Sequence, residues 1–287
     1  MKKIAFALCL VLVSQMFAKP SVVVSILPQK TFVEKIAKEL VDVTLMVTPG
    51  SSPHAYEPKA SQMIALSKAD VYFSVGVEFE EVWLTKFKSQ SPRLKFVDMS
   101  QGIQKIGIRA HHHGAHKDEH KTEAFHESLD PHIWTSPKNV AVMAKIIFET
   151  LVQLDPQNKP FYKANFDVFL AEIHATDKEI RAILKETQPK AKFMVFHPSW
   201  GYFAHEYNLT QFAVEVEGKN PKPKEMIMLI KEAKEEKVKV IFTQPEFSDK
   251  SAGIIAKEAN VRVEKISPLS PQWSQNLINM AKAIANK

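Results

Sequence analysis

The chain has 287 residues, a formal net charge of +6 and a single cysteine, with 45% hydrophobic and 24% charged residues. This balance is typical of a globular protein with a hydrophobic core. The excess lysines alternate with glutamates, as in residues 231–239, and no basic stretch is interleaved with aromatic residues, so the pattern indicates solvated helix faces and excludes a nucleic-acid-binding stripe.

The first 18 residues have the layout of a secretory signal peptide. Two lysines precede an apolar run over residues 4–13, and Ala18 offers a small residue for cleavage. The run is too short for a transmembrane helix, which needs about 20 apolar residues. A buried first strand or helix is the alternative interpretation. Because Cys9 lies in the run, the mature chain is expected to have no cysteine and no disulfide.

Short β-branched runs then alternate with helical patterns. Strands are predicted at 21–26, 41–47, 71–75 and 94–98, and helices at 29–40, 59–68 and 139–154. The same alternation returns later, with strands at 192–196, 238–243 and 262–266 and helices at 201–207, 223–236, 250–259 and 272–286. This order predicts an α/β fold with parallel sheets flanked by helices.

One predicted helix differs from the others in length. Residues 159–187 keep a helical spacing of apolar residues, whereas ordinary helices run about 8–20 residues. We interpret this segment as a linking helix, residues 158–187, between an N-terminal α/β lobe (19–157) and a C-terminal α/β lobe (188–287). The alternative is one continuous α/β domain with a long surface helix.

Six of the 11 histidines fall within residues 111–126. The segment is polar, lacks apolar periodicity and is expected to form a mobile loop. Imidazole suits Zn, Cu and Ni, so the loop is predicted to be an auxiliary arm that collects metal weakly. A polar loop that is incidentally rich in histidine is the alternative. The loop histidines are His111, His112, His113, His116, His120 and His126.

Three other histidines are stronger candidates for a tight metal site. His54 and His197 follow predicted strands, and ligands of open α/β sheets bind at the carboxyl ends of strands. His132 comes just after the histidine-rich segment. Three histidines and one further group satisfy tetrahedral Zn²⁺, although each histidine taken alone is more often structural. The three surrounding segments are PHAYEP (53–58), DPHIW (130–134) and FHPSWGYF (196–203).

These segments, together with GVEFE at 76–80, IFTQPEFS at 241–248 and SPLS at 267–270, make the chain similar to a known family. It resembles the periplasmic zinc-binding (ZnuA-type) solute-binding proteins of ABC importers, in the metal-specific cluster. The histidine-rich loop and His197 favour the zinc branch over the manganese branch, because Mn²⁺ prefers oxygen ligands.

The resemblance implies two α/β lobes joined by one long helix, with the metal in the cleft between them. His54 and His132 would come from the N-terminal lobe and His197 from the C-terminal lobe. It also implies a monomeric periplasmic protein, not an enzyme, that carries Zn²⁺ as transported ligand to an ABC permease at the inner membrane. The chain contains no HExxH and no GxSxG motif, so a zinc hydrolase is disfavoured.

The fourth metal ligand stays open at this point. Ser267 stands where manganese-type relatives carry an aspartate, and a serine hydroxyl is a poor zinc ligand. Water, a loop histidine or a carboxylate such as Glu57 are the alternatives, and Glu57 also fits an orienting role behind a histidine. Glu78 and Glu80 are weaker candidates for that orienting role. Alternative functions are binding of manganese or another divalent metal, or a surface adhesin or metal buffer.

Overall fold

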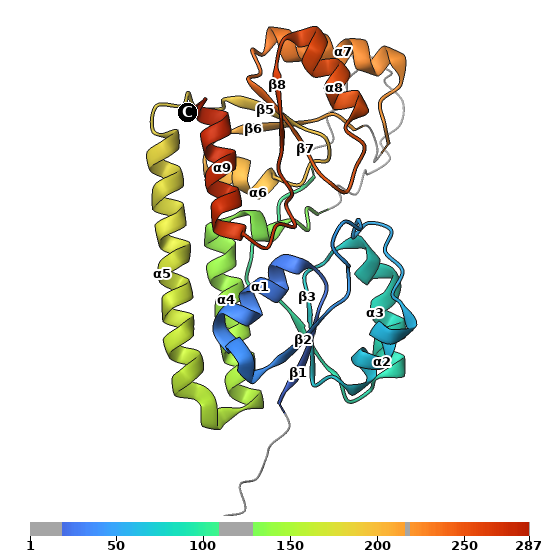
Figure 1. Ribbon diagram of the computed structural model, residues 1–287, viewed down its shortest axis with the longest axis vertical. Helices are drawn as coiled ribbons and strands as arrows, with labels where there is room; N and C mark the ends of the chain where they lie inside the picture. Colours follow the sequence, from blue (N-terminus) through green and yellow to red (C-terminus); the bar gives the residue numbers. More distant parts are fainter. Residues whose placement is uncertain (1–18, 109–128, 216–218, 287) are drawn as a thin grey trace, which may run out of the picture.

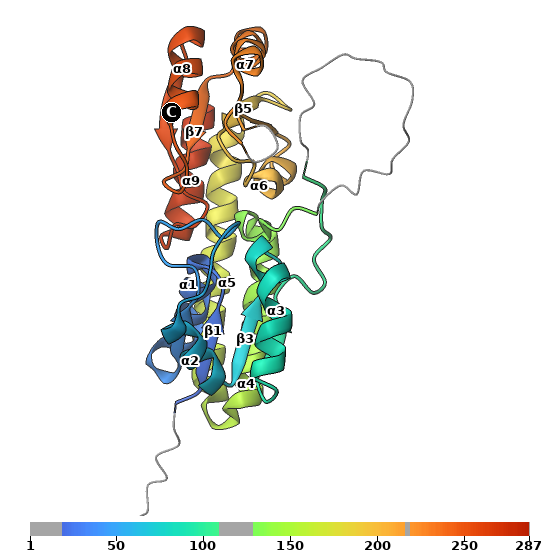
Figure 2. The same ribbon diagram turned by 90° about the vertical axis from the view of Figure 1, so that its right-hand side faces the viewer.

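The computed structural model describes residues 19–108, 129–215 and 219–286. The predicted signal peptide and the six loop histidines lie outside these residues. The described part forms two α/β lobes, one above the other, with a long helix running beside both (Figures 1 and 2). None of the described helices combines the length and apolarity needed to cross a membrane.

The N-terminal lobe is built on a four-stranded parallel sheet in the order β2-β1-β3-β4. The central strands β1 and β3 are apolar and almost fully buried, as expected for parallel strands covered by helices on both faces. The strands are β1 (Ser21–Val24), β2 (Asp42–Leu45), β3 (Val71–Ser74) and β4 (Lys95–Asp98), and the helices of this lobe are α1 (Leu27–Ala37), α2 (Ala60–Lys68) and α3 (Glu78–Gln90).

The C-terminal lobe repeats this arrangement, with the parallel strand order β6-β5-β7-β8. Each sheet therefore has a switch point between its two central strands, where consecutive crossovers leave in opposite directions. The strands are β5 (Lys192–Val195), β6 (Thr210–Ala213), β7 (Val240–Thr243) and β8 (Arg262–Lys265), and the helices are α6 (Gly201–Glu206), α7 (Pro223–Glu235), α8 (Lys250–Ala259) and α9 (Trp273–Ala285).

The chain passes from the N-terminal lobe to the C-terminal lobe through two consecutive long helices, of which the second spans both lobes. Helix α4 (Pro137–Leu154) begins where the Ser136 hydroxyl accepts the hydrogen bond of Asn139 N, and Pro137 occupies its first turn. Helix α5 (Lys159–Leu184) has 26 residues and runs along both lobes, packed against α4 below and α9 above (Figure 1). The predicted fold class, two parallel sheets with one long helix between the lobes, is confirmed.

The hydrophobic core is continuous across the two lobes. One cluster of buried side chains includes the N-terminal sheet, α5, α9 and one face of the C-terminal sheet, represented by Phe193 and Phe242. The opposite face of that sheet, with Met194 and Ile241, packs separately under α7 and α8. The long helix is therefore part of the core of both lobes.

Candidate metal centre

The structure brings the three predicted histidines together between the lobes. The ring centroids of His54 and His197 lie 4.3 Å apart, those of His132 and His197 5.2 Å, and those of His54 and His132 6.2 Å. One ligand nitrogen from each ring lies within 4.8 Å of the other two. Tetrahedral Zn²⁺ with bonds of about 2.0–2.1 Å needs nitrogens roughly 3.3 Å apart, so small side-chain shifts complete the geometry.

His197 is positioned by the parallel register of the C-terminal sheet. β5 pairs with β6 through Val195 and Ala213, so the chain two residues on places His197 opposite Glu215, and the main-chain bond from Glu215 N to Phe196 O (3.1 Å) extends the ladder. The ring nitrogen Nδ1 of His197 lies 2.8 Å from Glu215 Oε1.

Gln244 lies opposite His197 on the other side, because β5 pairs with β7 through Val195 and Phe242. The Gln244 side chain, 1% exposed, accepts the bond of His197 N (2.9 Å) and donates to His197 O (2.9 Å) and to Ser199 Oγ (2.7 Å). The backbone of His197 is therefore fixed by a buried amide.

His132 is held by a compact local motif. Asp130 Oδ1 accepts hydrogen bonds from His132 N (2.8 Å) and lies 2.7 Å from His132 Nδ1. A Cβ atom at Gly201 would lie 2.5 Å from Asp130 Oδ2, so only glycine fits at the start of α6. The segment is also attached to the C-terminal lobe, since Trp134 Nε1 donates to Pro268 O (2.8 Å) and Trp273 Nε1 donates to Trp134 O (2.7 Å).

His54 is the most exposed of the three, with 26% of its side chain accessible. It lies on the loop between β2 and α2, and its Nδ1 lies 2.8 Å from Glu78 Oε1 in the first turn of α3. Phe79 N donates to Pro53 O (3.2 Å), which ties the same turn of α3 to the histidine loop.

Each histidine thus pairs its Nδ1 with a carboxylate, from Glu78, Asp130 or Glu215. A carboxylate at Nδ1 favours the tautomer with the proton on Nδ1 and leaves Nε2 as the metal-binding lone pair. His197 Nε2 is buried and has no hydrogen-bond partner among the described residues, which is the state expected of a nitrogen reserved for a metal.

Electrostatics favour neutral imidazole and ionised carboxylate in this centre. Burial lowers the pKa of His197, and the nearby His132 and His54 lower it further, against the opposing effect of the hydrogen bond that His197 donates to the Glu215 carboxylate. Burial alone would raise the pKa of Glu78, but the hydrogen bond and charge of His54 hold that pKa below its ordinary value. Metal ions need deprotonated ligands, so both shifts favour metal binding.

The other predicted site residues in the described chain do not belong to the cluster of three histidines. The Glu57 side chain is exposed on the histidine loop. Ser267 Oγ donates to Glu246 Oε1 (2.9 Å). Glu80 lies on α3 beyond Glu78 and accepts hydrogen bonds from Ser25 Oγ, Val75 N (3.1 Å) and Gly76 N (2.7 Å), so it joins the ends of β1 and β3 rather than a histidine.

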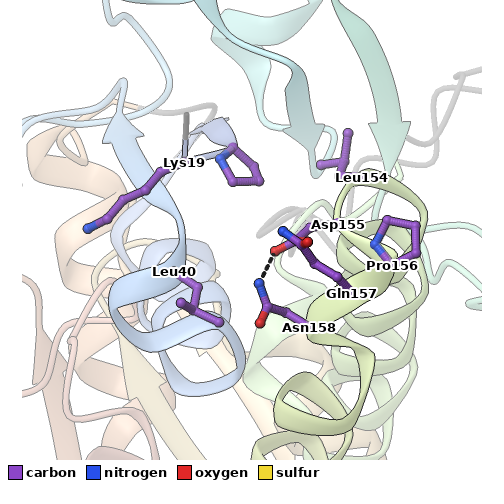
Figure 3. Close-up of a pocket in the computed structure, with 8 residues that line it drawn as sticks. Lys19, Leu40, Leu154, Asp155, Pro156, Gln157 and Asn158 are labelled. Atoms are coloured by element: carbon purple, nitrogen blue, oxygen red, sulfur yellow. Dashed lines mark hydrogen bonds between the residues drawn. The ribbon is translucent and has the colours of Figure 1, made fainter. Parts of the chain in front are cut away.

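A surface hollow of about 450 Å³ lies at the opposite end of the N-terminal sheet, where β1 begins (Figure 3). It is lined by Lys19, Leu40, Leu154 and neighbouring residues, and its carboxylate, Asp155, accepts hydrogen bonds from Asn158 Nδ2 (2.7 Å) and Tyr162 OH (2.8 Å). Its acidic group is therefore already satisfied, and the three histidines are the one ligand cluster of metal-binding size found in the described residues.

The chain is similar to known proteins over most of its length. The family described as "Zinc-uptake complex component A periplasmic" matches residues 22–287. The chain belongs to this family. A crystal structure named ZnuA has 40% sequence identity and a TM-score of 0.83, with 94% of this chain and 99% of that chain covered. A zinc-bound ZnuA deletion mutant has 40% identity and a TM-score of 0.82, with 94% and 98% covered.

Two groups of curated relatives extend the family comparison. The high-affinity zinc uptake system protein ZnuA of Bacillus subtilis is 30% identical over 257 residues, which are 88% of this chain and 79% of the relative. The zinc-binding protein AdcA of Streptococcus pyogenes is 28% identical over 263 residues. The chain spans about half of the length of AdcA, 50%, so AdcA carries further sequence that has no counterpart in this match.

Proposed function

We propose that the protein captures Zn²⁺ at His54, His132 and His197 and delivers it to an ABC-type importer. The observation that carries the proposal is the cluster itself: three imidazoles, each with Nδ1 on a carboxylate, whose ligand nitrogens lie within 4.8 Å of one another. A shell of imidazoles without a carboxylate favours zinc over manganese. Family membership and zinc uptake by the named relatives support the same function.

The location and partner follow from the same proposal. Residues 1–18 act as a signal peptide for export, and the mature protein, with an N-terminal lobe to residue 157 and a C-terminal lobe from 188, works in the periplasm. It docks as a monomer on the membrane permease and releases zinc there. The histidine-rich arm, residues 111–126, collects zinc weakly and raises its concentration near the tight site.

Calorimetric zinc titration of the H54A/H132A/H197A variant tests the site. Tight binding should be lost, because no described ligand cluster is left. The matched control is H174A/H205A, which removes two exposed histidines outside the centre and should bind zinc like the wild type. Tight binding that survives in the triple variant would rule out this site.

Two further experiments test the arm and the transport role. Deleting residues 111–126 should keep one tight site and remove only weaker binding; loss of the tight site would make the arm a primary ligand donor. A strain without the gene should fail to grow when a chelator removes zinc, and added zinc should restore growth. Normal growth in zinc-depleted medium would contradict an import function.

A further inference from the structure

The zinc centre has three imidazoles, and a tetrahedral ion needs a fourth group. Within the described chain, the ligand atoms that lie within 4.8 Å of one another come from His54, His132 and His197, and no carboxylate belongs to that set. A water molecule can fill the fourth position if a side chain just outside the cluster holds it. Glu246 is a candidate for that side chain, because it precedes Phe247, whose ring packs near His54 and His197.

The turn that carries Glu246 lies against two of the three histidines. Phe247 N donates to Gln244 O (3.1 Å), so the chain turns directly after β7, with Glu246 inside the turn. The ring of Phe247 stacks on His197 at 5.0 Å between centroids and lies 6.1 Å from the ring of His54. Glu246 is therefore adjacent in sequence to the residue that covers the two rings.

The other neighbour of Glu246 leads to the third histidine. Ser267 Oγ donates to Glu246 Oε1 (2.9 Å), and the next residue, Pro268, accepts the hydrogen bond of Trp134 Nε1 (2.8 Å). The ring of Trp134 lies 5.2 Å from the ring of His132. The turn that packs on His54 and His197 is thus joined through Glu246 and Ser267 to the segment that bonds Trp134, whose ring lies beside His132.

One carboxylate oxygen of Glu246 has no assigned partner. Oε1 accepts the Ser267 hydroxyl, whereas Oε2 is buried and makes no hydrogen bond with any described residue. A buried carboxylate oxygen without a donor is costly, and a nearby cation or bound water removes the cost. Glu78 and Glu215, which contact the three histidines, each have a buried oxygen of the same kind.

We infer that Glu246 supplies the negative charge of the fourth position, by accepting a hydrogen bond through Oε2 from a water bound to the metal. Ser267 fixes the carboxylate by bonding its other oxygen. This inference rests on the proposed function and adds a named residue to it. Ser267 then contributes to the centre through Glu246, as a positioning residue instead of a ligand.

The test compares E246Q with E258Q, which removes the same charge from an exposed site in the same lobe. Zinc affinity is measured by competition with a chelator, and the Co²⁺-loaded proteins are compared by visible absorption, which reports the donors around the ion. We expect zinc affinity of E246Q to fall about 10–100-fold, the usual effect of removing an outer partner of a metal centre, together with an altered Co²⁺ spectrum. E258Q should match the wild type in both.

The double variant E246Q/S267D places a carboxylate at position 267, next to the lost one, and should recover part of the lost zinc affinity. Wild-type zinc affinity in E246Q would overturn the inference. So would weaker affinity with an unchanged Co²⁺ spectrum, because that result means a loss of folding stability and not a change at the ion. If the wild type bound zinc no better than H54A/H132A/H197A, the proposed function itself would fail, which is a distinct result.

Discussion

The two sheets have opposite character at the carboxyl ends of their strands, although the strands follow the same order. In the C-terminal sheet, the matched positions just after β5, β6 and β7 carry His197, Glu215 and Gln244. The corresponding positions of the N-terminal sheet follow from the paired registers of β1 with β2 and β3, and they carry Ile26, Val47 and Val75. All three of these apolar side chains are buried, at 0%, 2% and 0% exposure.

Main-chain hydrogen bonds confirm that these positions correspond. Val47 N donates to Ser25 O (2.9 Å) beyond the end of β1, as Glu215 N donates to Phe196 O (3.1 Å) beyond the end of β5. One backbone geometry therefore supports the proposed metal ligand His197 in one lobe and a buried apolar contact in the other. The difference shows that the polar character of this end of the C-terminal sheet comes from its side chains and not from the fold that presents them.

Removing the imidazole of His197 at the end of the C-terminal sheet should have the largest effect on zinc affinity. Structural zinc sites are worth about 10–16 kcal/mol, or about 2.5–4 kcal/mol for each of four ligands, so H197A should lose roughly 10²–10³-fold in zinc affinity. The matched change at the end of the N-terminal sheet is I26V, since Ile26 corresponds to His197. It should leave zinc affinity unchanged and cost about 0.5–1.5 kcal/mol of stability. Chelator competition and urea unfolding measure the two effects. Equal losses of affinity in both variants would break the contrast.

Glu80, which joins the ends of β1 and β3, should control stability and its pH dependence. Burial raises the pKa of Glu80 to about 7, against the opposing hydrogen bonds from Ser25, Gly76 and Val75. A carboxyl with a raised folded-state pKa favours folding below its unfolded pKa of about 4.5, and that contribution is lost as pH rises through about 7.

In E80Q no carboxyl titrates, so the unfolding free energy of the metal-free wild type, relative to E80Q, should fall on the order of 3 kcal/mol from pH 4.5 to pH 8. Denaturant unfolding at a series of pH values measures this difference. E81Q, on the exposed side of α3, should show the wild-type dependence. A stability difference between E80Q and the wild type that does not vary with pH would mean that Glu80 stays ionised. A change in the zinc affinity of E80Q would mean that Glu80 also influences the metal site.

Gln244 should affect zinc affinity more than folding. Its amide fixes His197 through two main-chain hydrogen bonds, so Q244A should weaken zinc binding about 10–100-fold by loosening the ring. Q244E keeps an acceptor for His197 N but cannot donate to His197 O, and its effect should lie between the wild type and Q244A. Calorimetry gives the affinities. Full affinity in Q244A would show that Glu215 alone orients the histidine.

The smallest effect on zinc affinity is expected from a change at Glu78, the partner of the most exposed histidine, His54. The Glu78 side chain is 36% exposed and its partner His54 26%, whereas Glu215 and His197 are 7% and 10% exposed. Water can replace Glu78 at His54 Nδ1, so E78Q should lose less than about tenfold in zinc affinity and E215Q more. Both are measured in one titration series. A larger loss in E78Q would reverse the order of the two carboxylates.

Much of the fold could be predicted because alternating apolar strands and helices leave a strong pattern. β6 was missed because it is an edge strand, TQFA, that buries only its last two residues. α3 was missed because three glutamates fill its first turn and its buried residues form a narrow set, Phe79, Glu80 and Phe87. The helix predicted at 159–187 ends at Leu184.

Only part of the candidate metal site could be predicted from the sequence. The three histidines could be predicted from their motifs and from strand ends, and Asp130 had a local signal, since it lies two residues before His132. Glu215 had none, because its place beside His197 depends on the register of β6, which was not predicted. Gln244 likewise depends on the pairing of β5 with β7. These partners arise from tertiary pairing and not from spacing along the chain.

The continuous core has a thermodynamic consequence for the whole molecule. Buried side chains run from the N-terminal sheet through α5 and α9 to Phe193 and Phe242, so the two lobes share one apolar interior. Separating the lobes would expose that surface to water at about 25 cal/mol for each Å². The lobes therefore belong to a single cooperative folding unit, and heat should melt both sheets in one calorimetric transition that zinc shifts as a whole.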